Sequence, residues 1–407
     1  MAQDPASLDV LLVIRARVED YPPTVNQANL LAQRGLRVGL VDLARATSNG
    51  SPLRPSISRW QAHRAWLSKT EPAPPFARRC ANWLRFRRTF HTVMRVCRPK
   101  VVIAYDEAAC AYLQPRTGAY RAVYHFHDLT EPEGRSGLAT RFSSSTVRRR
   151  SRRADLVVFP DALRAQYYRE RARLPAAPAI VMNCPLRMTE PPHSALPELL
   201  SARGLSGRDA VCYLGSVGLD QGLPEAAQSM RHWPERSLFV LIGPYTPAVR
   251  DRILESAGEV NAADRVVFLG EQPHAHALAL AAGGAVGLSL IQPNTRNWLY
   301  SAGAINKRFE YMALGLPQVS TGSPGVAEII EHNQCGTCVD PYSPESIGVA
   351  VRQLLDSEAQ RHRFAKNARM LHLKRYNYEQ QFHEVAEWIE RSCRVPAVAE
   401  SAALSHA

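Results

Sequence analysis

The chain has 407 residues, with 45% apolar and 21% charged side chains. This length exceeds one comfortable hydrophobic core, so two domains are expected, and the composition excludes a disordered chain. The longest apolar run, residues 277–291, contains two adjacent glycines and is too short to cross a membrane. The start has no basic stretch followed by an apolar core, and the eight cysteines are scattered. A cytoplasmic protein with reduced thiols and no secretory signal is therefore predicted.

The net charge is +13, and the excess of arginine and lysine lies mainly at 77–100 and 146–155. A surplus of this size predicts an anionic partner, which could be nucleic acid, membrane phospholipid or a phosphorylated substrate.

The first half of the chain alternates apolar strands with helices. A strand at 9–16 is followed by a helix at 24–35 and a strand at 36–44. A basic helix at 76–98 then leads into further strands, which are expected at 100–106, 121–129, 154–160 and 178–185. Strand, helix, strand in repetition is typical of a parallel α/β sheet.

The second half repeats the pattern after a polar, proline-bearing stretch that is interpreted as a linker at 191–208. Strands are expected at 210–216, 237–243, 265–270, 285–291, 317–321 and 336–341. The predicted domains are thus 1–190 and 209–375, followed by an amphipathic helix at 376–394 and a flexible tail at 395–407. The fold class is α/β with two Rossmann-like domains, and ligands are expected in a cleft at the carboxyl ends of the strands.

The stretch AINKRFEYMALGLPQVSTGSPGVAEII, residues 304–330, places charged side chains at the start of a short apolar helix. Asn306 is predicted to cap a helix that begins at Lys307 and ends before Gly315. Free N–H groups, the helix dipole and the Lys307 amine favour phosphate oxygens. Glu310 lies one turn further on the same side, where a carboxylate can accept both hydroxyl protons of a ribose. The pattern fits a nucleotide, and a surface ion pair between Lys307 and Glu310 is the alternative.

Residues 306–355 resemble the donor-binding half of glycosyltransferase family 4, which has a GT-B fold. The family carries a Lys-x-x-Glu-Tyr-Met-Ala-x-Gly-x-Pro run followed by Glu-Ile-Ile and Gly-x-x-Val-x-Pro, in the order found here. The likeness extends upstream to 213–230 and 266–291, and more loosely to the strands of the first half, such as 123–129. The helix at 376–394 is similar to the one that crosses back onto the first domain. The resemblance covers about 370 residues.

The resemblance implies a retaining, metal-independent transfer of a sugar from a nucleotide-diphosphate donor to a glycan or lipid-linked acceptor, in polysaccharide biosynthesis. No cofactor is expected beyond the donor substrate. A sugar-nucleotide epimerase of the same fold, or a catalytically inactive relative, is the alternative. The implied catalytic residues are His127, Asp128 and Glu310, and the implied donor-binding residues are Gly215, Ser216, Asn306, Lys307 and Glu310.

Three positions depart from the family pattern. Ala302 stands where the family has a first glutamate, and Ser216 and Gln221 stand where an arginine and a lysine often clamp the diphosphate. Each lost charge-assisted hydrogen bond would cost about 1.5–3 kcal/mol of phosphate binding unless it is replaced. Lys307, Arg308 and Arg296 are the candidate replacements.

The basic helix at 78–98 interleaves aromatic and arginine side chains. It fits either a core helix with a solvated basic face or peripheral attachment to the anionic inner face of a membrane. No nucleic-acid-binding motif accompanies the charge, so no nucleic-acid partner is expected. The Cys335–Cys338 pair and the histidines at 274 and 276 are interpreted as structural, and no metal ligands are predicted.

Overall fold

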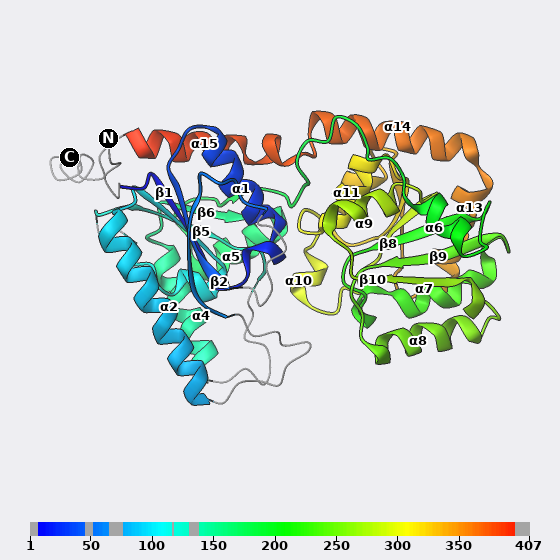
Figure 1. Cartoon of the computed structure of the whole chain (residues 1–407), viewed down its shortest axis with the longest axis horizontal. Coiled ribbons are helices and arrows are strands. Elements are labelled where there is room, and N and C mark those ends of the chain that lie inside the picture. Colours follow the sequence, from blue (N-terminus) through cyan, green and yellow to red (C-terminus); the bar gives the residue numbers. More distant parts are fainter. Residues whose placement is uncertain (1–6, 45–51, 65–75, 116–117, 130–137, 395–407) are drawn as a thin grey trace. The chain divides into compact units, whose positions relative to one another are not determined.

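The computed structural model describes residues 7–44, 52–64, 76–115, 118–129 and 138–394 (Figure 1). The chain folds into two compact units. Unit 1 comprises Met1–Met182 together with Gln381–Ala407, and unit 2 comprises Asn183–Gln380.

Unit 1 is built on a parallel sheet with the strand order β3-β2-β1-β4-β5-β6-β7. The strands are β1 Val10–Ile14, β2 Val38–Ala44, β3 Ser58–Arg64, β4 Val101–Tyr105, β5 Arg121–His125, β6 Leu156–Phe159 and β7 Ala179–Ile180. Every residue of β1 and β4 is buried, as expected for central strands that are covered on both faces. The strand order reverses between β1 and β4, which makes the carboxyl ends of these strands the place where such a sheet binds ligands.

Six helices of unit 1 lie in the described part of the chain. Their bounds are α1 Pro22–Gln33, α2 Phe76–Cys97, α3 Asp106–Cys110, α4 Leu138–Ser151, α5 Ala162–Ala172 and α15 Tyr378–Arg394, with a 3₁₀ helix at Val18–Asp20. Helix α15 crosses the boundary between the units, and from Gln381 onward it belongs to unit 1. Its apolar side chains Phe382, Val385 and Ile389 are buried, and Arg34, which directly follows α1, pairs with Glu390 at 2.9 Å.

Unit 2 has a parallel sheet of its own, in the order β10-β9-β8-β11-β12-β13. Its strands are β8 Asp209–Leu214, β9 Ser237–Ile242, β10 Val266–Gly270, β11 Val286–Ser289, β12 Gln318–Thr321 and β13 Gly336–Val339. Its helices are α6 Leu196–Ala202, α7 Leu223–Ser229, α8 Pro247–Gly258, α9 His274–Ala281, α10 Arg296–Leu299, α11 Asn306–Leu314, α12 Val326–Ile330, α13 Pro344–Asp356 and α14 Glu358–Lys374. Short 3₁₀ helices lie at Leu219–Gln221, Met230–His232 and Ala263–Arg265.

Alternation along the strands divides the core of unit 2 into two layers, because successive side chains of a strand point to opposite faces. Val211 and Tyr213 of β8 pack with α7, α8 and α13 on one face. Ala210, Cys212 and Leu214 of the same strand pack with α6, α9 and α11 on the other. The strand order reverses between β8 and β11, so the ligand edge of this sheet lies at their carboxyl ends.

The prediction of two parallel α/β sheets is confirmed, but two strands differ from expectation. Strand β3 was not predicted, because its sequence SRWQAHR has no apolar run and only two apolar residues, Trp60 and Ala62, which alternate with polar ones over a short stretch. It lies at the edge of the sheet, where among the described residues it pairs with β2. Strand β7 has two residues, Ala179–Ile180, where eight were expected. Within the stretch interpreted as a linker, helix α6 buries Leu196 and Leu200 in the core of unit 2.

None of the described helices combines the length and the apolar character needed to cross a membrane. The two cysteines of the Cys335–Cys338 pair are free, and burial raises the pKa of each thiol to about 12. Both thiols therefore stay protonated near neutral pH, in agreement with the structural role that was predicted for them.

Candidate functional site

Helix α11 carries three of the predicted donor-binding residues in its first two turns. The helix begins at Asn306 and ends at Leu314, and Gly315 closes it in the left-handed conformation with a φ of 69°. The prediction that Asn306 caps the helix is wrong, because Ile305 occupies that position and Asn306 is the first helical residue. The backbone of Ile305 is extended, and its side chain caps none of the N–H groups of the first turn, whereas the N–H of Arg308 donates to the carbonyl oxygen of Ile305 at 3.3 Å. The N–H groups of Asn306 and Lys307 have no partner in the described part of the chain and are therefore open to a ligand.

Buried side chains hold the loop that precedes α11 in place. The buried guanidinium of Arg308 donates from Nη1 to the carbonyl oxygens of Ser301 and Ala302, at 2.9 and 2.6 Å. Asn183 donates to the carbonyl oxygens of Gly303 and Ala304, each at 2.9 Å. Arg308 therefore fixes the loop from the protein interior, and the expectation that it replaces a phosphate clamp is not met.

The Lys307 amine reaches into the glycine-containing loop that follows β8. Its Nζ donates to the Tyr213 hydroxyl at 2.9 Å and to Oε1 of Gln221 at 3.1 Å, and it lies 4.3 Å from the centre of the Tyr213 ring. Gly215 has a φ of 122°, and a side chain there would come within 3.3 Å of Lys307 Cε. Gly215 thus provides both the turn and the room for the lysine.

The Lys307 amine has no carboxylate in hydrogen-bond contact within the described chain. Desolvation by its surroundings lowers the pKa of Lys307 to about 7, and the charge of Glu310 opposes this effect only in part. The adjoining Ser216 is exposed, and its carbonyl oxygen accepts a hydrogen bond from the Tyr213 hydroxyl at 2.8 Å. A partly buried amine beside open N–H groups is well suited to receive an anion.

Glu310 lies one turn beyond Lys307 and is 7% exposed. Burial raises the pKa of its carboxyl group, while nearby His274 and Lys307 act in the opposite direction. Oε1 of Glu310 lies 3.5 Å from Nε2 of His274, which is the first residue of α9 and is largely exposed. Sequence reasoning treated His274 only as a candidate metal ligand and missed its position beside Glu310. No motif signals that contact, because it depends on how α9 and α11 pack.

Ala302, at the position of the family's first glutamate, is buried, and its methyl group lies where a side chain on Gly325 would approach to 3.1 Å.

Within the described residues no three His, Cys, Asp or Glu side chains gather as a metal site would require.

In unit 1, His127 follows strand β5 and forms a pair with Asp106. Nδ1 of His127 lies 3.0 Å from Oδ2 of Asp106, and Oδ1 of Asp106 accepts the backbone N–H of His127 at 2.7 Å. Nε2 of His127 lies 3.3 Å from the hydroxyl of Thr24, and its ring stacks on Tyr105. The hydrogen bond from Nδ1–H to the Asp106 carboxylate fixes both the tautomer and the plane of the imidazole.

Asp106 is a functional candidate that sequence reasoning missed. It directly follows β4 and has a φ of 57°, a left-handed conformation that is uncommon outside glycine. A polar residue at the end of a central strand next to the point where strand order reverses was the available signal. Such backbone conformations are often retained where they position a functional side chain.

Asp128 differs from its neighbour in environment. Its carboxylate is 65% exposed and lies 3.3 Å from Nη1 of the buried Arg164. The same nitrogen donates to the carbonyl oxygen of His127 at 2.5 Å. Arg164 thus anchors the loop that carries both residues, and Asp128 is a partner in that anchor.

The structure therefore gathers Gly215, Lys307 and Glu310 at the ligand edge of unit 2, with Ser216 and Asn306 beside them. His127 and Asp128 lie together at the ligand edge of unit 1. Both sets lie where strands end beside a reversal of strand order.

This architecture, two parallel α/β units with helices on both faces of each sheet, is shared with solved glycosyltransferase structures of the GT-B fold. Sucrose-phosphate synthase from Thermosynechococcus elongatus matches with a TM-score of 0.71 and 15% identity, over 94% of this chain and 98% of that chain. WaaG, a glycosyltransferase involved in lipopolysaccharide biosynthesis, matches with a TM-score of 0.68 and 16% identity, over 93% and 99%. Anabaena HepE in complex with UDP and glucose matches with a TM-score of 0.69 and 16% identity, over 94% and 100%.

Residues 203–371 match the model of the family described as glycosyl transferases group 1. This segment contains β8 to β13, and with them Gly215, Lys307 and Glu310. Residues 203–371 therefore form a group 1 glycosyltransferase domain. A comparison of the sequence with curated proteins found no match.

Proposed function

We propose that the chain is a retaining glycosyltransferase that moves a sugar from a nucleotide-diphosphate donor to a glycan or lipid-linked acceptor, without a metal ion. The observation that carries the proposal is the placement of two side chains on α11. The Lys307 amine has no carboxylate in hydrogen-bond contact within the described chain, and the Glu310 carboxylate is buried one turn further on. Lys307 and the N–H groups of the first turn supply positive charge for a diphosphate. The Glu310 carboxylate supplies an acceptor for hydrogen bonds from the two hydroxyl groups of a ribose.

The proposed reaction breaks the bond between the anomeric carbon and the diphosphate oxygen. The acceptor oxygen bonds to that carbon on the same face, and its proton passes to the leaving diphosphate. Lys307 and the open N–H groups would stabilise the charge that develops on the diphosphate, a fixed electrostatic contribution that does not require a metal. His127, oriented by Asp106, would contact the reacting sugar, and Asp128 would hold the loop that carries His127.

UDP-sugars are the first donors to test. Anabaena HepE has been solved in complex with UDP-glucose, and an E. coli trehalose-6-phosphate protein with UDP-2-fluoro glucose. We extend this nucleotide to the present chain as part of the proposal, and surface polysaccharide assembly in the cytoplasm as its setting. The exposed arginines of α2 would attach the protein to the anionic inner face of a membrane, at about 1 kcal/mol per basic residue near the surface.

The role of Glu310 can be tested with a donor that lacks one ribose hydroxyl. Wild-type protein should bind the 2′-deoxy form of its UDP-sugar about tenfold or more weakly than the natural donor, because a hydrogen bond to a charged group is lost. Glu310→Ala should bind both donors weakly and equally. Isothermal titration calorimetry measures both affinities, and Glu255→Ala is a matched control, since Glu255 is exposed on α8.

Three results would contradict the proposal. The first is a Glu310→Ala variant that still discriminates between the two donors as wild type does. The second is conversion of UDP-GlcNAc to an epimer in the absence of any acceptor, which would identify a sugar-nucleotide epimerase. The third is binding of the donor without turnover on any acceptor, which would identify an inactive relative.

A further inference from the structure

A cationic hollow, separate from the donor site of unit 2, lies in unit 1 on the side of the sheet covered by α2 and α4. It has a volume of about 230 Å³ and is lined by Trp83, Arg87, His91, Ala111, Tyr112, Gln114 and Arg150. Pockets that hold a whole drug-sized ligand measure about 300–1,000 Å³, so this hollow suits a single small group. None of its lining residues is among those assigned to donor or acceptor chemistry.

The charge of this hollow is uncompensated within the described residues. Helices α2 and α4 contain no aspartate or glutamate, and neither Arg87 nor Arg150 has a carboxylate partner in the described part of the chain. Glu107 of α3 does not line the hollow, because it is buried and accepts a hydrogen bond from Ser144. Two guanidinium groups in one small hollow would repel each other unless an anion lay between them.

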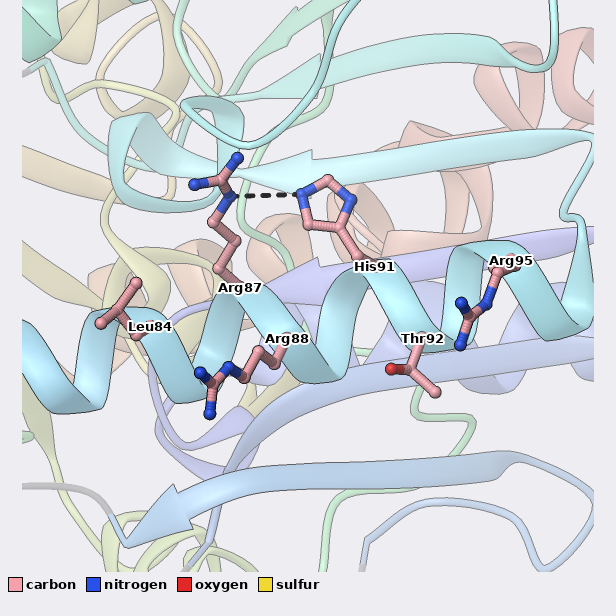
Figure 2. A pocket seen from close by; sticks show the side chains of 6 residues that line it. All are labelled: Leu84, Arg87, Arg88, His91, Thr92 and Arg95. Carbon is pink, nitrogen blue, oxygen red and sulfur yellow. Dashed lines mark hydrogen bonds between the residues drawn. The ribbon is translucent and has the colours of Figure 1, made fainter.

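The two arginines are held by contacts that leave donors for a ligand. Arg150 uses Nη1 for the carbonyl oxygens of Ala111 and Leu113, at 2.8 and 3.2 Å. Arg87 uses Nε for Nε2 of His91 at 3.4 Å, and its guanidinium lies over the Trp83 ring at 5.5 Å. Figure 2 shows Arg87 and His91 one turn apart on α2 and joined by this hydrogen bond. The remaining N–H groups form the planar forks that match phosphate oxygens.

Tyr112 gives a second, independent indication of a ligand. It is 7% exposed, and its ring packs against Trp83, Phe86 and Phe90. Its hydroxyl has no hydrogen-bond partner among the described residues. A buried hydroxyl without a partner costs about 1–3 kcal/mol, so such groups usually have a partner in the functional state. Burial raises the pKa of Tyr112 to about 12, so the hydroxyl remains a proton donor.

We propose that Arg87, Arg150 and Tyr112 form a binding site for a phosphate ester on unit 1, separate from the donor site of unit 2. The cationic surface continues on both sides of the hollow. Arg87 and His91 also line a neighbouring hollow with Arg88 and Arg95, and Arg150 lines another with Arg149 and Arg153. A phosphate seated between α2 and α4 would thus lie in a field of one sign. The ester could belong to a soluble phosphorylated molecule or to a phospholipid headgroup.

The soluble source is tested by titrating the protein with glycerol phosphate in a Lys307→Met background, which weakens anion binding at the unit 2 site. Arg87→Ala should weaken binding about tenfold or more, since a charge-assisted pair is lost. Tyr112→Phe should weaken it about fivefold without lowering the melting temperature, because the hydroxyl makes no internal hydrogen bond. Arg85→Ala is the matched control, since Arg85 is exposed on the same helix and lines none of the three hollows.

The lipid source is tested by sedimentation with vesicles of phosphatidylcholine, with and without phosphatidylglycerol. Binding to the anionic vesicles that falls with Arg87→Ala and Tyr112→Phe, but not with Arg85→Ala, supports a headgroup as the ligand. Binding of glycerol phosphate alone, with the same dependence on the variants, supports a soluble ligand. The proposal is overturned if Arg85→Ala weakens binding as much as Arg87→Ala, or if neither probe responds to Arg87→Ala.

Discussion

The fold partly buries the Lys307 amine, and within the described residues no carboxylate is in hydrogen-bond contact with it. Its partners, the Tyr213 hydroxyl and the Gln221 amide oxygen, are neutral. This environment disfavours the ammonium form and lowers its pKa to about 7. An arriving diphosphate would restore the missing counter-charge and raise the pKa again. Donor binding should therefore be coupled to uptake of a proton.

The coupling predicts a pH dependence with a definite sign. At pH 6 the free amine is mostly charged, so binding of a nucleotide sugar should take up almost no proton. At pH 8 it is mostly neutral, so binding should take up about one proton and be correspondingly weaker. Calorimetry in buffers of different ionisation enthalpy measures this number. A nucleotide sugar is preferable to a free diphosphate, because a terminal phosphate also titrates with a pKa of about 6.

Lys307→Met should abolish the proton uptake at pH 8, whereas Lys366→Met, at an exposed position of α14, should leave it unchanged. Proton uptake that persists in Lys307→Met would assign it to another group, such as His274, and would remove Lys307 from the diphosphate site.

Single residues were predictable where the local sequence carries the signal. Lys307, Glu310 and Gly315 lie in one short run whose helix, charge spacing and end can be read directly. Asp106, Tyr213 and His274 could not be assigned in this way, because each contacts a residue that lies at least 21 positions away in the chain. Such contacts depend on the order of strands, which local patterns do not encode.

At the scale of the element, the position of α11 is set by Tyr311. Its buried hydroxyl accepts the backbone N–H of Leu214 at 3.0 Å and donates to the carbonyl oxygen of Leu288 at 3.0 Å. Strand β11 has glycine at position 287, where a side chain would come within 2.7 Å of the Tyr311 ring. The helix that carries Lys307 and Glu310 is thus fixed to both central strands of unit 2.

Tyr311→Phe should lower the free energy of unfolding of unit 2 by about 1–3 kcal/mol, because the N–H of Leu214 would be buried without a partner. Urea unfolding followed by circular dichroism measures the change. Tyr342→Phe makes the same chemical change at a half-exposed position and should stay within about 0.5 kcal/mol of wild type. Equal stability of Tyr311→Phe and wild type would show that α11 is held by packing alone.

Elements were predictable in proportion to their burial. The central strands β1 and β4 are apolar and fully buried, and both were predicted within a few residues. The edge strand β3 was missed, because most of its residues, among them Arg59 and His63, are polar. Arg59 instead forms ion pairs with Asp42 at 2.5 Å and Glu19 at 2.8 Å, so charge rather than apolar patterning secures this strand.

At the scale of the whole molecule, unit 1 is assembled from two segments that are separated in sequence by all of unit 2. Its last part is the portion of α15 after Gln380, which buries Phe382, Val385 and Ile389. Sγ of Cys393 lies 3.5 Å from the carbonyl oxygen of Asp9, beside the start of the central strand β1. Unit 1 therefore cannot complete its core until the chain has passed through unit 2.

A chain that ends at Gln380 should keep a folded unit 2 and destabilise unit 1. Each large apolar side chain contributes about 1.5–3 kcal/mol when it is fully buried, and domains have a net stability of only about 5–15 kcal/mol. Hydrogen exchange followed by mass spectrometry should show lost protection in β1, β2 and α1, with protection in β8 and α11 unchanged. The affinity for the donor, whose site we assign to unit 2, should fall less than the amide protection of unit 1 does.

A chain that ends at Arg394 is the control and should behave as wild type, since α15 remains complete. Undiminished protection in β1 after removal of residues 381–407 would mean that the first 182 residues fold alone, so that α15 only covers a finished core.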